Sequence, residues 1–112
     1  MQTYRATVRG RFDGLDEGAR AALLAAADEH DMYSAAYTEA GTLTYDPTLS
    51  WFAFRCEVRV SPEEGAAAAE ERAGALARRA VAAFGADHRD LRSELVNMDE
   101  IKIRRKVRSR KG

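Results

Sequence analysis

The chain has 112 residues, of which 46% are hydrophobic and 32% are charged, and its formal net charge at pH 7 is zero. This length fits one domain with a single modest core, and the composition excludes a disordered chain and a membrane-spanning one, because no apolar run approaches about 18 residues. Cys56 is the only cysteine. No intramolecular disulfide can form, and the N-terminus has no apolar signal segment, so we expect a cytoplasmic protein.

The first predicted elements are a strand and a helix. Residues 3–12 alternate, with an apolar face formed by Tyr4, Ala6, Val8, Gly10 and Phe12. This period of two predicts a half-buried strand. Asp13-Gly14 predicts a turn, and Asp13 or Asp16 is placed to cap an amphipathic helix over residues 15–30.

Two strands are expected next. The period of two returns over residues 33–45, interrupted by Glu39 and Gly41, which suggests a bulge or bend in one long strand. Asp46-Pro47-Thr48 predicts a tight turn. Residues 51–60 alternate most clearly of all, so the two strands are predicted to form an antiparallel hairpin.

A second helix and a last strand follow. Ser61 and Glu64 form a capping-box pattern around Pro62, which indicates a helix that runs to Phe84 and stops at Gly85. The alanines of its inner stripe allow a close approach to a sheet. A strand is expected from Asp90 to Val96, with a turn at Asp99-Glu100 and a short extra strand over residues 101–107.

The order β-α-β-β-α-β predicts an α+β fold, the ferredoxin-like sandwich. Two helices would cover one face of a four-stranded antiparallel sheet and leave the other face open. The expected division is a single domain, residues 1–101, and a basic C-terminal tail, residues 102–112. The domain has 11 basic and 18 acidic residues, a net charge of −7, whereas the tail carries +7.

The outward residues of the first and third strands form a charged sheet face with one tryptophan. Arg5 and Arg9 are placed to pair with Glu57 across neighbouring strands. A solvated charged face is one interpretation. Burial by a second copy is another, which would give a homodimer through the open sheet face and cover Trp51. Stacking of Trp51 on a base is the third, although no RNA-recognition motif is present.

Candidate pocket or sheet-face residues come from several elements. The tyrosines at residues 33, 37 and 45 share a strand with Glu39, and either line a pocket or belong to the core. His30 and His88 are the only histidines, and no metal-ligand spacing links them to Cys56, so we expect neither metal nor cofactor. The candidates are Tyr33, Tyr37, Glu39, Trp51, Arg55, Arg9 and His88.

Two further stretches suggest anion binding. The basic tail offers Lys102, Arg104, Arg105, Lys106 and Arg108 to nucleic acid, although terminal charge runs are usually only solvated. The stretch around Gly10 resembles the phosphate loop of acylphosphatases. That resemblance breaks at Asp13, where the family has an arginine, and residues 33–45 lack its catalytic asparagine. We therefore predict a strand-to-helix turn.

Four segments resemble a family of small uncharacterised actinobacterial proteins with a domain of unknown function. They are "VRGRFDGL", "TEAGTLTYD", "FAFRCEV" and "HRDLRSELVNMDEIKIRR", spread over nearly the full length. The resemblance implies a ferredoxin-like fold and a lineage. It transfers no catalytic residue, and the long basic ending here departs from the family pattern.

Three functional hypotheses follow from different classes. The first is a non-catalytic, homo-oligomeric module that binds a ligand, such as a small aromatic or anionic molecule, or a protein partner. The alternative is a cofactorless enzyme of the dimeric α/β-barrel kind, similar to monooxygenases and cyclases of aromatic secondary metabolism. The third is nucleic-acid binding through the basic tail. The first two differ in whether a pocket holds a group able to move a proton.

Overall fold

The computed structural model describes residues 1–27 and 36–100. The chain forms a four-stranded antiparallel sheet with helices, an α+β arrangement in the predicted element order. A third helix begins at Met98, where the sequence predicted a turn. The predicted strand over residues 101–107 lies outside the described residues. The elements are β1 (Gln2–Asp13), α1 (Glu17–Ala25), β2 (Thr42–Tyr45), β3 (Trp51–Val60), α2 (Gly65–Ala82) and β4 (Asp87–Asn97).

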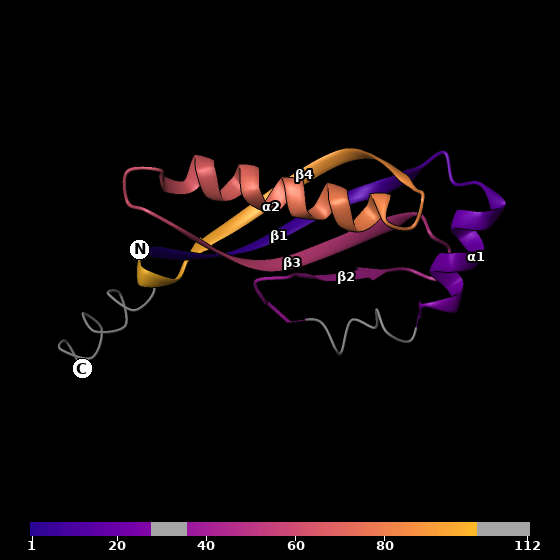
Figure 1. The fold of residues 1–112 in the computed structure, drawn as a ribbon, viewed down its shortest axis with the longest axis horizontal. Helices are drawn as coiled ribbons and strands as arrows, with labels where there is room; N and C mark the ends of the chain where they lie inside the picture. Colours follow the sequence, from indigo (N-terminus) through magenta and orange to yellow (C-terminus); the bar gives the residue numbers. More distant parts are fainter. Residues whose placement is uncertain (28–35, 101–112) are drawn as a thin grey trace.

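The strands lie in the order β2-β3-β1-β4, so β1 and β3 are central and β2 and β4 are the edges. Figure 1 shows α2 lying along one face of this sheet. The predicted alternation of β1 and β3 is confirmed, because Val8 and Phe54 are register partners and both are buried beneath α2. Ala69, Ala73 and Ala77 of α2 are completely buried, and their small side chains let the helix lie close to the strands.

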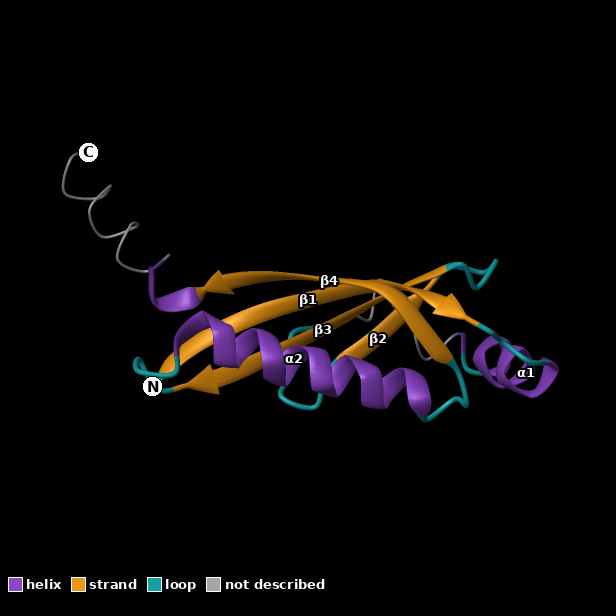
Figure 2. Cartoon of the chain, turned by 90° about the horizontal axis from the view of Figure 1, so that it is seen from above, coloured by secondary structure: helices purple, strands orange, loops and turns teal. Residues whose placement is uncertain are grey.

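Helix α1 departs from its predicted length and place. Asp16 caps it, since its carboxylate accepts a hydrogen bond from the Ala19 N–H at 2.7 Å, but the helix ends at Ala25 and not at residue 30. It lies beyond one end of the sheet and does not cover a face beside α2 (Figures 1 and 2). Leu23 anchors it in the core, and the Tyr45 hydroxyl donates to the Leu23 carbonyl.

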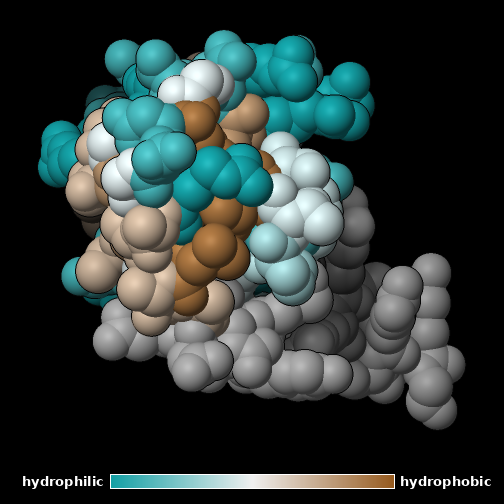
Figure 3. All heavy atoms as spheres, turned by 90° about the vertical axis from the view of Figure 1, so that its right-hand side faces the viewer, coloured by the Kyte–Doolittle hydropathy of each residue, from teal (hydrophilic) through white to brown (hydrophobic). Residues whose placement is uncertain are grey.

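The end of the molecule where α1 lies exposes apolar atoms. Figure 3 shows a band of hydrophobic residues between hydrophilic ones on this side. Leu24 of α1 is 52% exposed, whereas its neighbour Leu23 is fully buried. A nine-residue helix at the end of a sheet buries a narrow stripe, so its remaining apolar residues face outward.

The long strand predicted over residues 33–45 is wrong in its described part, residues 36–45. Within that part, only Thr42–Tyr45 pairs regularly with β3, and Thr38 makes a separate parallel bridge to Cys56. Gly41 turns the chain between these two contacts with φ of +86°. A Cβ built on Gly41 would lie 1.9 Å from Cζ of Phe54, so the backbone approaches that ring closely. Gly41 is therefore the turn after which β2 begins, and not a bulge within a longer strand.

The start of α2 also differs from its prediction. Ser61 and Glu64 make the predicted reciprocal hydrogen bonds, with the Ser61 N–H donating to Glu64 at 3.0 Å. This backbone hydrogen bond, together with Arg72, holds the pKa of the Glu64 carboxyl below its ordinary value. Residues 62–64 form a turn, however, and Gly65 has φ of +67°, so the α-helix begins only there.

Strand β4 is longer than the predicted span from Asp90 to Val96. The ladder with β1 shifts between Arg9 and Arg11, and Asp90 has φ of +56° at this irregularity. The bulge allows β4 to continue back to Asp87. Helix α2 ends at Ala82, before the predicted end at Phe84, and Gly85, with φ of +74°, closes the turn that follows it.

Candidate functional site: the open sheet face

The sheet face opposite α2 carries the side chains that alternate with the core residues, and we call it the open face. Arginines outnumber carboxylates on it. In β1 and the residues paired with it, the carboxylates are Asp13, Glu57, Asp87 and Glu94. The arginines are Arg5, Arg9, Arg11, Arg55, Arg59, Arg89 and Arg92. This face therefore has an excess of positive charge, seven arginines against four carboxylates.

Two ion pairs offset part of this charge. Arg5 lies opposite Glu57 in the register, with a closest N–O distance of 3.8 Å, as predicted. Arg9 was also expected to pair with Glu57. It pairs instead with Glu94 of β4 at 2.9 Å, because β4 lies on the other side of β1. The Glu94 side chain is 73% exposed, so this pair contributes little to stability.

A hollow lies on the open face where β3, β1 and β4 run side by side. It has a volume of about 410 Å3 and is lined by Arg9, Gly10, Arg11, Trp51, Asp90 and Arg92. The register places Trp51 opposite Arg11, and Arg92 opposite Arg9. The bulge in β4 brings Asp90 to the rim. We call this site the arginine–tryptophan hollow.

The hollow combines an aromatic surface with unneutralised positive charge. Trp51 is 42% exposed although it is the largest side chain on the face. Within residues 1–27 and 36–100, the ion pairs involve neither Arg11 nor Arg92. Guanidinium groups form bidentate hydrogen bonds to carboxylates and phosphates, and an indole stacks on flat rings. The arrangement is therefore suited to an anion that also carries a flat or aromatic group.

Tyr37 covers another part of the open face. Its hydroxyl lies 3.0 Å from the Thr7 hydroxyl, and the Arg5 guanidinium lies 5.5 Å from the centre of its ring. The Thr38 carbonyl accepts the Glu57 N–H at 2.8 Å and so holds this segment against β3. Because the chain crosses to the open face here, Tyr37 stands over β1 and lies outside the core.

The other candidate residues are not gathered into one pocket. Tyr45 lies on the core side, where its ring meets Phe12 edge to face at 5.9 Å, so it is separated from Tyr37. Glu39 is exposed in a bend, and Arg55 donates to the Thr44 hydroxyl at 3.3 Å. His88 pairs with Phe12 and belongs to the side of the sheet opposite the hollow.

Several predicted sites lie outside the described residues. These are Tyr33, His30 and the tail candidates Lys102, Arg104, Arg105, Lys106 and Arg108. Within the described part of the chain, no group of three His, Cys, Asp or Glu side chains is arranged to hold a metal ion. Burial raises the pKa of the Cys56 thiol, which is completely buried. In residues 1–27 and 36–100, no helix is long and apolar enough to cross a membrane.

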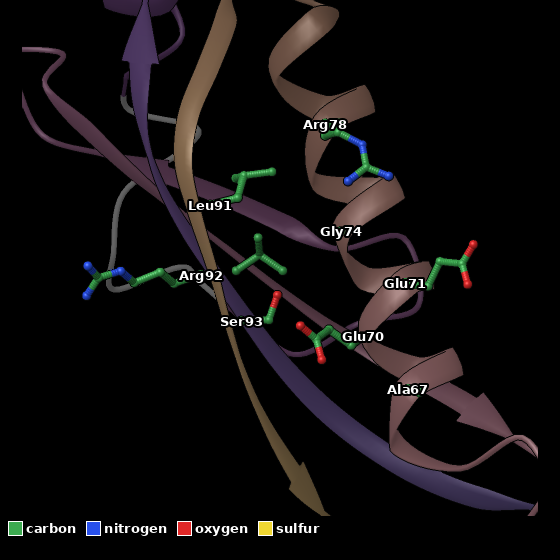
Figure 4. Close-up of a pocket in the computed structure, with 9 residues that line it drawn as sticks. Ala67, Glu70, Glu71, Gly74, Arg78, Leu91, Arg92 and Ser93 are labelled. Atoms are coloured by element: carbon green, nitrogen blue, oxygen red, sulfur yellow. The ribbon is translucent and has the colours of Figure 1, made fainter.

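A second hollow, between α2 and β4, was not found from the sequence. It has a volume of about 430 Å3 and is lined by Val8, Ala67, Glu70, Glu71, Gly74, Arg78, Leu91, Arg92 and Ser93. Figure 4 shows Leu91 and Ser93 directed toward α2 and Arg92 directed away from it. The sequence feature that could have indicated this hollow is the small size of Gly74 and Ser93, which leaves space between the helix and the edge strand. We call this site the α2–β4 groove.

The comparison with protein families gives one result that covers almost the whole chain. Residues 1–109 match the family of unknown function DUF6204. The chain belongs to this family. The match spans all of the segments that suggested a domain of unknown function, so that part of the prediction is confirmed. No curated protein and no solved structure matches the chain.

Proposed function

We propose that this DUF6204 chain is a non-catalytic binding module that holds an anionic ligand with an aromatic group in the arginine–tryptophan hollow. The observation that carries the proposal is the position of Arg9, Arg11 and Arg92 around the half-exposed Trp51. The ligand's acid group would meet the arginines while its ring lies against the indole. We also propose that the element order and the sheet order together make the fold ferredoxin-like.

The energetics support a ligand at this place. An indole exposed to water lacks the favourable free energy of burial, and clustered guanidinium groups repel one another at close range. An anionic aromatic molecule offsets both costs, since it covers Trp51 and neutralises Arg11 and Arg92. Asp90 at the rim limits the number of negative charges that the hollow accepts. Monoanions are therefore expected to bind better than polyanions.

The homodimer through the open face stays a prediction. Placing two such faces together would bring arginines against arginines, so it requires anions between the two sheets. The cofactorless enzyme remains the alternative. Of its candidate tyrosines that the structure describes, Tyr37 is the one on this face. Nucleic-acid binding through the tail, an actinobacterial origin and a cytoplasmic location likewise stay predictions.

Fluorescence of Trp51 tests the proposal directly, because it is the only tryptophan in the chain. We would titrate the full-length protein with benzoate, and with benzamide and acetate as probes that lack the charge or the ring. Saturable quenching by benzoate at lower concentrations than by either control is the expected result. No saturable change with benzoate, or equal affinity for benzamide, would overturn the proposal.

A pair of matched variants locates the binding site. Arg11→Gln removes one guanidinium from the hollow, and Arg20→Gln makes the same change on the exposed side of α1. We expect Arg11→Gln to weaken benzoate binding about tenfold, the loss of one charge-assisted contact, and Arg20→Gln to leave it unchanged. Equal effects of both substitutions would indicate nonspecific attraction and contradict a site at the hollow.

A further inference from the structure

Strand β4 is an edge strand with an unusual length. It has 11 residues and pairs with β1 on one side, while its other side forms no ladder with any described strand. A long edge presents a row of unpaired N–H and C=O groups, which is a template for another strand. The bulge at Asp90 interrupts the first part of this edge, so the regular part runs from Leu91 to Asn97.

We propose that a second copy of this chain pairs antiparallel with β4 about a two-fold axis at Ser93. Residues at equal distances on either side of Ser93 would then face each other across the axis. The two four-stranded sheets would join edge to edge into one continuous sheet. A two-fold interface of this kind requires that one surface be complementary to itself, and β4 meets this requirement on both of its faces.

On the open face, the register brings opposite charges together. Arg92 would lie opposite Glu94 of the second copy, and Glu94 opposite Arg92, so the axis generates two ion pairs. Both side chains are exposed in the single chain. Glu94 already binds Arg9 at 2.9 Å, so it would lie between two guanidinium groups. Directly opposed charges of opposite sign stabilise an antiparallel pair of strands.

On the core face, the same register brings leucine to leucine. Leu91 would lie opposite Leu95 of the second copy, and both side chains are only partly buried in the single chain. Ser93 would face itself at the axis, where a small side chain allows the strands to approach. Pairing therefore completes the burial of two leucines in each copy, which is favourable.

Neighbouring registers are worse, and this selects Ser93 as the centre. An axis at Arg92 would place Arg92 against itself, and an axis at Glu94 would place Glu94 against itself. Like charges directly opposite each other destabilise a sheet. An axis at Leu91 would carry the ladder through Asp90, whose φ of +56° is incompatible with regular strand pairing. An axis between two residues would place core side chains opposite surface ones.

Helix α2 supplies an independent observation. Gly74 and Ser93 line the same groove, as Figure 4 shows, so an axis at Ser93 runs beside the middle of α2. Glu70 lies four residues before Gly74, and Arg78 four residues after it. A two-fold rotation about this axis therefore brings Glu70 of one copy to the same end of the interface as Arg78 of the second copy. The charges of α2 and β4 are complementary about the same point.

This dimer leaves the open face accessible. The two arginine–tryptophan hollows would lie on the same side of the joined sheet, one on each side of the axis. The interface does not depend on a ligand. It shares Arg92 with the hollow, but the benzoate test relies on Arg11 and Trp51, neither of which lies in β4. Failure of the dimer proposal and failure of the proposed function can therefore be told apart.

Cross-linking at the axis tests the register. Opposed residues of antiparallel strands have Cα atoms about 4.5–5.5 Å apart, within the range that a disulfide spans. We expect full-length Ser93→Cys protein to form a cross-linked dimer on oxidation with copper phenanthroline. The control, Val96→Cys, is 44% exposed on the same strand but would face Asp90 and should not cross-link. The native Cys56 is buried and does not compete.

Charge exchange tests the interface without a disulfide. By sedimentation equilibrium, we expect Arg92→Glu and Glu94→Arg each to raise the dimer dissociation constant at least tenfold, and the double variant to restore most of the affinity. Arg20→Glu, the matched control on α1, should leave it unchanged. The proposal is overturned if the full-length protein is monomeric, if the single exchanges have no effect, or if Val96→Cys cross-links as readily as Ser93→Cys.

Discussion

At the scale of single residues, Gly41 decides the path of the segment that reaches the open face. Its φ of +86° is a conformation that favours glycine, and its Cα lies against the Phe54 ring. We expect Gly41→Ala to destabilise the protein by about 2–4 kcal/mol, since it adds backbone strain and overpacking together. Urea denaturation followed by circular dichroism measures this change.

Gly14 is the matched control for Gly41. It also has a positive φ, +59°, but a Cβ there would meet nothing within 4 Å. Gly14→Ala should therefore lower the free energy of unfolding only by the cost of the left-handed backbone conformation, about 1–2 kcal/mol. Equal costs at the two positions would contradict the close packing of Gly41 on Phe54.

Asp46 organises the turn that delivers Trp51 to the hollow. Its carboxylate accepts hydrogen bonds from the Ser50 and Trp51 N–H groups at 2.9 and 3.0 Å, and from the Thr48 hydroxyl. Burial raises the pKa of Asp46, but these hydrogen bonds outweigh it and the pKa is lowered. We expect Asp46→Ala to cost about 1–2 kcal/mol in urea denaturation, and Asp46→Asn, which keeps an acceptor, to cost less.

The lowered pKa of Asp46 also fixes the sign of a pH effect. Its contribution to stability is fully present above the pKa of the unfolded chain, about 3.9, and is lost as the pH falls through the lower pKa of the folded state. The difference in unfolding free energy between the native protein and Asp46→Ala should therefore shrink below about pH 4. A difference that persists unchanged at lower pH would contradict this role of the carboxylate.

At the scale of elements, α2 lies close to the sheet because its inner residues are alanines. Ala77 is completely buried, whereas Ala82 is exposed on the same helix. We expect Ala77→Leu to destabilise the protein by about 1–3 kcal/mol, because the larger side chain pushes the helix from the strands. Ala82→Leu should change stability by less than about 0.5 kcal/mol. Thermal unfolding of both variants, compared with the native protein, measures the two effects.

Elements with a regular period were predictable, and elements shaped by a distant contact were not. Strand β3 was predicted with its correct bounds, because alternation over ten residues is a local signal. The period of two over residues 33–45 was interrupted at Glu39 and Gly41, and the described residues 36–41 form no regular strand. The close contact between Gly41 and Phe54 and the bridge from Thr38 to Cys56 decide this path, and neither is visible in a local period.

At the scale of the whole molecule, both candidate sites arise from the order of the strands. Arg9 was assigned to Glu57 from the β1–β3 pairing alone, but β4 lies on the other side of β1 and brings Glu94 and Arg92 beside it. The arginine–tryptophan hollow needs three adjacent strands, and the α2–β4 groove needs a helix over an edge. Sequence patterns identified Trp51 and Arg9 as candidates, while only the register joined them with Arg11 and Arg92.

Chemical labelling of Cys56 tests whether the molecule unfolds as one unit. Its thiol is completely buried in β3, between β1 and the segment held by Thr38. Burial also raises its pKa, so the reactive thiolate is scarce in the folded state. We expect a thiol reagent to label Cys56 only when the protein unfolds globally. The free energy of opening derived from the labelling rate should then equal the free energy of global unfolding. Labelling by mass spectrometry across a urea series, with fully unfolded protein as the control, measures this.

The dependence of labelling on urea separates global from local opening. A slope equal to that of equilibrium unfolding indicates that the sheet and α2 open together, because the slope follows the surface exposed. A much shallower slope would contradict cooperative unfolding and indicate local detachment of residues 36–45 from β3. Gly41→Ala weakens the contact of this segment with Phe54, so in that variant local detachment should become easier than global unfolding and the slope should fall.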